Sequence, residues 1–142
     1  MNNKRIGNIG EVKALSKFVE LGIPVYLPFG DNETADLIAD FNGKLNKIQV
    51  KTSIKAEDGK MTFQVCSAQS STRKNIPSAR HIYTKNEVDY FVLYNIERDE
   101  LLLVPFEIIE GKIEITIRYE PPKNNQKIGI HMNSDFTFET YI

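Results

Sequence analysis

The chain has 142 residues, of which 41% are hydrophobic and 26% are charged, and its formal net charge is −1. This length predicts a single domain over residues 1–142 with its own hydrophobic core. The one cysteine, Cys66, excludes an internal disulfide and a cysteine-cluster zinc site, and we expect it to be a small buried side chain. No apolar run reaches bilayer length, so we expect a cytoplasmic protein with no membrane partner.

The first predicted helix extends from about residue 8 to residue 22. Helical winding places six apolar side chains on one arc: Val12, Ala14, Leu15, Phe18, Val19 and Leu21. Glu11 falls in the middle of this arc. An ionised carboxylate that faces a core is costly unless a cation or hydrogen-bond donors compensate it. We therefore expect Glu11 to meet a partner, and the next forty residues offer Asp36, Gln49, Lys51 and a metal ion that they could share.

The later elements follow from alternation and turn signals. A short extended piece is expected at residues 24–28, and strands are expected at 35–41, 45–52, 61–66, 89–96, 101–106 and 112–119. We expect the strand at 61–66 to extend the same sheet as its predecessors. Residues 67–85 are rich in serine and arginine and are interpreted as either a short helix or a long functional loop. Residues 124–142 are expected to carry one more strand or short helix.

Asn42-Gly43 is the strongest hairpin signal in the chain. If these two residues form the turn, counting outward pairs Leu37 with Ile48 and Asp36 with Gln49. Directly opposed residues on antiparallel strands have Cβ atoms about 4.5–5.5 Å apart. The sequence therefore predicts that the Asp36 carboxylate and the Gln49 amide are cross-strand neighbours.

Lys51 shares a sheet face with Gln49, so one face presents a carboxylate, an amide and an ammonium group together. If the helix brings Glu11 beside Asp36, the two carboxylates repel each other unless a divalent cation lies between them. Oxygen ligands from Glu11, Asp36, the Gln49 amide and a backbone carbonyl such as that of Val50 suit Mg²⁺ better than zinc. An ordinary polar sheet face, or a Glu11 satisfied without any metal, remains the alternative.

A basic stretch lies between Asp58 and Glu87 and contains no acidic residue. Its cations predict contacts with an anionic partner such as nucleic acid, against the alternative of a solvated loop. The cations of this stretch include Arg73, Lys74, Arg80 and Lys85.

The order of these parts resembles the PD-(D/E)XK nuclease superfamily, and within it the small group of group I intron homing endonucleases that carry a Gln-x-Lys variant. The segments that carry the resemblance are Gly10-Glu11, Pro28 with Gly30-Asp31-Asn32, Ala35-Asp36-Leu37-Ile38, Ile48-Gln49-Val50-Lys51-Thr52, Val88-Asp89-Tyr90-Phe91, Val104-Pro105-Phe106 and Asn124-Asn125-Gln126. Two departures matter. Ala35 replaces the proline of the family name, and Gln49 removes one negative charge from the acidic motif position.

The resemblance implies an α/β fold with a PD-(D/E)XK restriction-endonuclease-like core, in which helices flank a central mixed β-sheet. It also implies metal-dependent hydrolysis of phosphodiester bonds in double-stranded DNA, with Mg²⁺ as cofactor and Mn²⁺ as a substitute. Asp36 would be the central metal ligand, Glu11 the assisting acid, Gln49 the substitute at the acidic position and Lys51 the catalytic lysine. Arg73, Lys74, Arg80 and Lys85 of the basic stretch would contact backbone phosphates of the DNA. A homodimer or homotetramer is expected, because one site of this type cuts one strand.

The alternative interpretation is a catalytically weak or inactive DNA-binding module on the same fold. It follows from the charge that Gln49 removes, which should weaken metal binding. Whether the biological role is homing, restriction or junction resolution stays open on the sequence.

Overall fold

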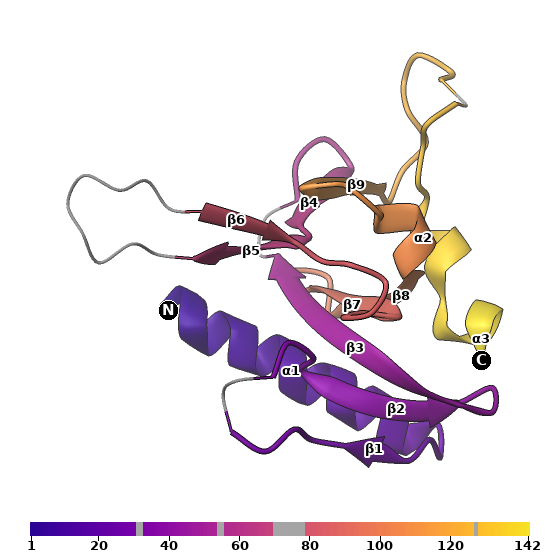
Figure 1. Cartoon of the computed structure of the whole chain (residues 1–142). Helices are drawn as coiled ribbons and strands as arrows, with labels where there is room; N and C mark the ends of the chain where they lie inside the picture. Colours follow the sequence, from indigo (N-terminus) through magenta and orange to yellow (C-terminus); the bar gives the residue numbers. More distant parts are fainter. Residues whose placement is uncertain (31–32, 54–55, 70–78, 127) are drawn as a thin grey trace.

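The computed structural model describes residues 1–30, 33–53, 56–69, 79–126 and 128–142. A mixed sheet forms its centre, and its strands lie in the order β1 (Val25–Tyr26), β2 (Leu37–Phe41), β3 (Lys44–Ser53), β7 (Tyr90–Asn95) and β8 (Glu100–Pro105) (Figure 1). β3 and β7 run parallel, and the other neighbouring strands are antiparallel. The α/β class and the mixed central sheet that the sequence predicted are confirmed.

The β2–β3 hairpin has the predicted register. Leu37 is paired with Ile48, and the two turn residues Asn42 and Gly43 have φ angles of 56° and 73°. A two-residue turn of this type requires positive φ at both central positions, which asparagine and glycine tolerate. β2 begins at Leu37, so Asp36 lies immediately before the strand and is not a paired strand residue opposite Gln49.

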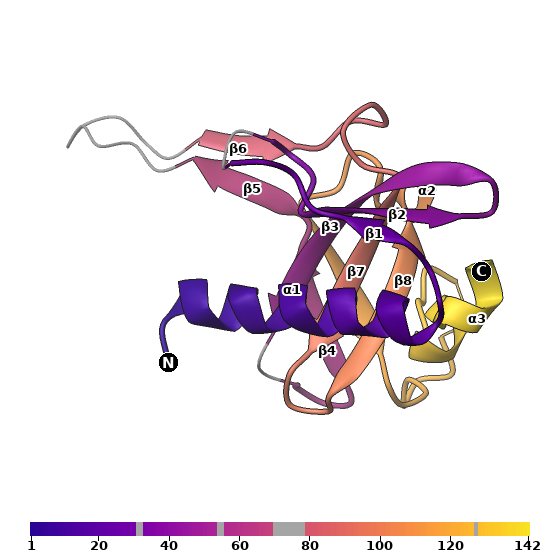
Figure 2. The same cartoon turned by 90° about the horizontal axis from the view of Figure 1, so that it is seen from below.

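Helix α1 (Asn3–Glu20) crosses one face of the central sheet (Figure 2). It begins earlier than predicted, because the Asn2 side chain accepts a hydrogen bond from the Arg5 backbone N–H and caps the first turn. The predicted apolar arc was right for Ala14 and Phe18, which are buried, and wrong for its exposed members. Val12 and Val19 are 64% and 58% exposed, and the buried stripe consists of Gly10, Ala14 and Phe18.

Two hydrophobic clusters lie on opposite faces of the sheet. The first joins Ala14 and Phe18 of α1 to the even-numbered side of β3, including Ile48 and Val50. The second is centred on Phe91 and is covered by a separate two-stranded sheet of β4 (Lys60–Gln64) and β9 (Glu114–Arg118). The prediction that residues 61–66 extend the central sheet was wrong, because β4 pairs with a strand about fifty residues further along the chain.

Residues 70–78 of the predicted helix or loop at 67–85 lie outside the described residues, and the flanking parts form two strands instead. β5 (Cys66–Gln69) and β6 (Ala79–Ile82) pair as an antiparallel hairpin that extends toward the same end of the molecule as the N-terminus of α1 (Figures 1 and 2). Cys66 is buried and unpaired with another cysteine, as expected. The short helix α2 (Phe106–Ile109), a 3₁₀ turn (Asn133–Phe136) and α3 (Phe138–Tyr141) complete the described elements. None of the described helices has the length and apolar character to cross a bilayer.

Candidate active site

Asp36 is fixed to β3 at two points. Its backbone N–H donates to the Ile48 carbonyl at 2.9 Å, and its carboxylate Oδ2 accepts from the Val50 N–H at 2.8 Å. Burial raises the pKa of Asp36, and the Val50 hydrogen bond and the positive charge of Lys51 offset only part of that rise. The carboxylate is therefore held in place without being fully compensated.

Glu11 reaches this region because α1 lies very close to β3. A Cβ atom added at Gly10 would lie 1.9 Å from the Thr52 hydroxyl oxygen, so only glycine permits the approach. Glu11 itself stays on the exposed side of the helix, not in the core-facing position that the sequence suggested. Partial burial raises the pKa of Glu11 and the Asp36 charge raises it further, so the two carboxylates are near enough to repel each other.

Gln49 projects from β3 toward the cluster around Phe91, which is the face opposite α1. It is only 7% exposed, and its side-chain oxygen Oε1 has no hydrogen-bond partner among the described residues. Buried side-chain oxygens are normally satisfied, so this oxygen has an acceptor capacity that a cation or a water molecule would use.

Lys51 lies two residues beyond Gln49 on the same face. Its ammonium group donates to the Cys66 carbonyl at 3.2 Å and to the Tyr83 hydroxyl at 3.4 Å. Burial lowers the pKa of Lys51, and the negative charge of Asp36 works against that change. No ion pair within 4 Å joins Lys51 to Asp36 in the described part of the chain.

Tyr83 is a residue of this region that the sequence did not indicate. It follows β6 at a position with no motif and no regular alternation around it. Tyr83 comes close to Lys51 only because β5 pairs with β6. Nine residues of a serine-rich stretch separate these two strands, so no local sequence pattern predicts their pairing.

The oxygen-bearing groups on and around the second half of β3 are of the chemical type that hard divalent cations bind. They are the carboxylates of Glu11 and Asp36, the unpartnered oxygen of Gln49, and the Val50 carbonyl. This carbonyl points to the same side of the strand as the Val50 N–H that Asp36 accepts. The described residues contain no group of three His, Cys, Asp or Glu side chains that could hold a metal ion. A sparse oxygen set of this kind suits Mg²⁺, which keeps several water ligands, better than zinc.

An open cavity of about 300 Å³ lies beside these groups, between the first turns of α1 and the end of β3. It is lined by Asn3, Ile6, Gly7, Val50, Lys51, Thr52 and Ser53. The candidate catalytic lysine therefore borders a space that opens to solvent on the N-terminal side of α1.

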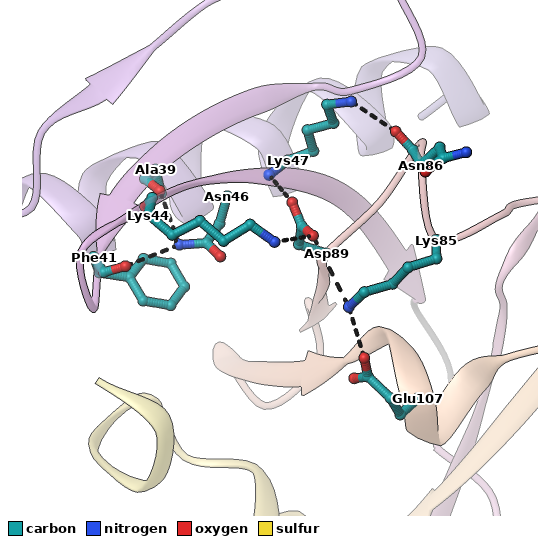
Figure 3. Close-up of polar contacts among 9 residues, drawn as sticks. All are labelled: Ala39, Phe41, Lys44, Asn46, Lys47, Lys85, Asn86, Asp89 and Glu107. Carbon is teal, nitrogen blue, oxygen red and sulfur yellow. Dashed lines mark hydrogen bonds and ion pairs between the residues drawn. The ribbon is translucent and has the colours of Figure 1, made fainter.

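The predicted phosphate-binding cations have different surroundings. Arg73 and Lys74 lie outside the described residues. Arg80 is exposed on β6. Lys85 donates to Glu107 at 2.6 Å and lies 3.9 Å from the Asp89 carboxylate (Figure 3). Two carboxylates would thus compete with a phosphate for Lys85, whereas nothing in the described structure engages the side chain of Arg80 in an ion pair.

Asp89 is the centre of a second polar cluster further back along β3. Its carboxylate accepts from the Lys44 ammonium at 2.8 Å and from the Lys47 backbone N–H at 2.9 Å (Figure 3). Burial by itself would raise the pKa of Asp89, but these hydrogen bonds and the charges of Lys44 and Lys85 lower it overall. Neighbouring Asn46 is buried and donates to the carbonyls of Ala39 and Phe41. The hydrogen-bond partners of Asp89 and Asn46 in this cluster are thus other residues of the protein.

Comparison with known proteins gives two positive findings. The PD-(D/E)XK endonuclease family matches residues 1–139 of the chain. Among solved structures, the bacterial homing endonuclease I-Ssp6803I is similar, with a TM-score of 0.73 and 26% sequence identity over 91% of this chain and 86% of that one. No curated protein sequence matches.

Proposed function

The chain belongs to the PD-(D/E)XK endonuclease family, and we propose that it is a metal-dependent endonuclease that hydrolyses phosphodiester bonds in double-stranded DNA. The observation that carries this proposal is the arrangement at the end of β3. There, the Asp36 carboxylate accepts the Val50 N–H, and its charge acts on Glu11 and Lys51, whose pKa values are both perturbed. Gln49 of the same strand adds a side-chain oxygen that has no hydrogen-bond partner among the described residues. Lys51 borders the open cavity, and a largely buried group with a perturbed pKa at a cavity is typical of a catalytic site.

We assign the divalent cation to Glu11, Asp36, Gln49 and the Val50 carbonyl, with Mg²⁺ as the natural ion and Mn²⁺ as a substitute. The raised pKa values of the two carboxylates support this assignment, because a cation between them would relieve the repulsion and burial that raise them. When bound, such an ion supplies Lewis-acid stabilisation of phosphoryl charge and helps to generate the nucleophile.

The protein groups have separate tasks in this proposal. Asp36 is rigid because both its backbone and its carboxylate are tied to β3, so it defines where the reacting phosphate lies. Lys51 uses two of its three N–H donors on Cys66 and Tyr83, which leaves one for a phosphate oxygen or for the attacking water. A preorganised positive charge of this kind stabilises the negative charge that grows in the transition state.

The β5–β6 hairpin is the proposed support for the DNA backbone. Arg80 on β6, together with Arg73 and Lys74 of the segment between the two strands, would neutralise phosphates without reading bases. Lys85 remains a weaker candidate because Glu107 already pairs with it. Cutting both strands of a duplex requires two sites of this type, so we propose a homodimer or homotetramer as the working form.

The test is cleavage of supercoiled plasmid by the purified full-length protein with Mg²⁺, Mn²⁺ or EDTA. We expect nicked or linear product with either metal and none with EDTA. Asp36→Ala and Lys51→Ala should each lower the cleavage rate by about a hundredfold or more, consistent with the loss of electrostatic stabilisation of the transition state. Glu110→Ala, which removes an exposed carboxylate after α2, is the control and should cleave normally. Equal activity of the wild type and Asp36→Ala would contradict the assignment.

A DNA-binding module without full catalytic activity is the second candidate. It is favoured by the presence of only two carboxylates at the site, since the described residues hold no group of three potential charged or histidine ligands. Calorimetric titration with Mn²⁺ separates the two functions. A module that binds DNA without cutting it should show no Mn²⁺ binding that Asp36→Ala removes.

A further inference from the structure

The Lys51 ammonium group is hydrogen-bonded to residues of β5 and of the segment after β6, and not to Asp36. Its ammonium contacts are the Cys66 carbonyl of β5 and the hydroxyl of Tyr83, which follows β6. Both contacts are with neutral oxygens, so they orient the cation without neutralising it. An ion pair with Asp36 would instead have cancelled the two charges that a phosphate hydrolase needs.

Tyr83 is held firmly enough to act as a fixed support. It is 7% exposed, and its ring makes edge contacts with His81 and Phe91 at centroid distances of 5.5 and 5.8 Å. The Lys51 ammonium lies 5.3 Å from the centroid of the same ring, within the range of a cation–π interaction. Burial raises the pKa of Tyr83, so its hydroxyl stays protonated and accepts the lysine hydrogen bond as a neutral group.

We propose that Tyr83 is a positioning residue that, with the Cys66 carbonyl, holds the Lys51 ammonium apart from Asp36 and directs its remaining N–H donor to the scissile phosphate. This inference rests on the proposed nuclease function. It also connects the catalytic lysine to the β5–β6 hairpin, because both of its tethers belong to β5 or to the residue directly after β6.

The decisive variant is Tyr83→Phe, which keeps the ring, its packing and the cation–π contact but removes the hydroxyl. Tyr141→Phe is the matched control. It removes a phenolic hydroxyl that donates to the Asp135 carbonyl near the C-terminus and touches none of the site residues. Single-turnover cleavage with Mg²⁺ measures the chemical step, and DNA affinity is measured with Ca²⁺ in place of Mg²⁺. In the metal-free protein, the ¹H–¹⁵N resonance of the Lys51 ammonium, assigned by its loss in Lys51→Ala, reports the tether directly.

We expect Tyr83→Phe to lower the single-turnover rate by roughly 10- to 100-fold, the size of one hydrogen bond to a charged group. DNA affinity should stay within about twofold, and the Lys51 resonance should shift or broaden; Tyr141→Phe should change none of the three. Equal rates for Tyr83→Phe and Tyr141→Phe, a parallel loss of DNA affinity, or an unmoved Lys51 resonance would each overturn the inference. If the wild type cuts no DNA, the proposed function fails, while the Lys51 resonance still decides whether Tyr83 holds the lysine.

Discussion

Asp36 and Asp89 both accept a hydrogen bond from a backbone N–H of β3, but their pKa values shift in opposite directions. Each accepts a hydrogen bond from a β3 backbone N–H, from Val50 at 2.8 Å and from Lys47 at 2.9 Å respectively. Asp89 also has the Lys44 ammonium at 2.8 Å, whereas Asp36 has no ion-pair partner within 4 Å in the described structure. The pKa of Asp89 is consequently lowered and that of Asp36 is raised.

Under the proposed function, this difference distinguishes a carboxylate that stabilises the fold from one that is available to a ligand. A backbone N–H alone places a carboxylate but does not offset the cost of its burial. Around Asp89, hydrogen bonds and positive charges more than offset the cost of burying the carboxylate. Around Asp36, they offset only part of that cost. The comparison therefore predicts that the same substitution lowers activity but not stability at Asp36, and lowers stability but not activity at Asp89.

The largest expected effect is on cleavage. Asp36→Asn keeps an oxygen that can accept the Val50 N–H but removes the charge, so the single-turnover rate should fall by about 10³-fold or more. Asp89→Asn should retain the rate within about fivefold, because its cluster lies about four residues back along β3 from Lys51, roughly 13 Å at the usual rise per residue. Comparable losses in both variants would break the comparison.

The next effect concerns the approach of α1 that brings Glu11 near Asp36. Gly10→Ala places a methyl group against Thr52 and should destabilise the protein by about 1–3 kcal/mol, the usual cost of overpacking. Gly7→Ala on the same helix is the control, since nothing lies within 4 Å of its added Cβ, and it should stabilise by up to about 1 kcal/mol. Urea unfolding measures both. Equal midpoints for the two variants would show that the close approach does not determine how α1 packs.

A smaller effect is expected when the charge of Asp89 is removed. Asp89→Asn should lower the free energy of unfolding by about 1–2 kcal/mol at pH 7, because a charge-assisted hydrogen bond is lost while the Lys44 side chain remains 58% exposed to solvent. Glu107→Gln, which weakens only the exposed pair with Lys85, should cost less than about 1 kcal/mol. Asp36→Asn should not destabilise the protein at all.

The smallest effect is the pH dependence of these differences. Because the folded pKa of Asp89 is lowered, its stabilising contribution is complete above the unfolded pKa near 3.8 and is lost as the pH falls through the folded value. Asp36 has the opposite sign: ionisation costs stability, and the cost grows as the pH rises from about 3.8 through its raised folded pKa. Unfolding curves should be measured between pH 3 and 8. As the pH rises above about 3.8, the free energy of unfolding of Asp36→Asn should increase relative to the wild type, while that of Asp89→Asn should stay lower than the wild type by a constant amount.

The sequence predicted the hairpin register because the Asn42-Gly43 turn is a local signal. The pairing of Leu37 with Ile48 then follows by counting outward from that turn. It also indicated the four candidate site residues through motif order. The contact between the Asp36 carboxylate and the Val50 N–H was not predictable, because it requires β2 to begin only at Leu37, so that the Val50 N–H bonds to the Asp36 side chain.

The errors have physical reasons as well. The packing stripe of α1 was predicted only in part, because Gly10 has no side chain to add to an apolar pattern although it allows the close approach to β3. The pairing of β4 with β9 and of β5 with β6 depends on segments far apart in sequence or separated by polar residues, so local periodicity does not reveal it. Tyr83 was missed for the same reason.

The double attachment of Asp36 has a practical consequence for engineering. Since Asp36 is tied to Ile48 and Val50, we expect its position to depend more on β3 than on the residues directly before it. The connection between β1 and Asp36 carries the fully exposed Phe29, and a surface hollow of about 570 Å³ lies against it. Under the proposed nuclease function, this connection is the first place to vary the sequence when DNA preference is to be altered while Asp36 stays in position.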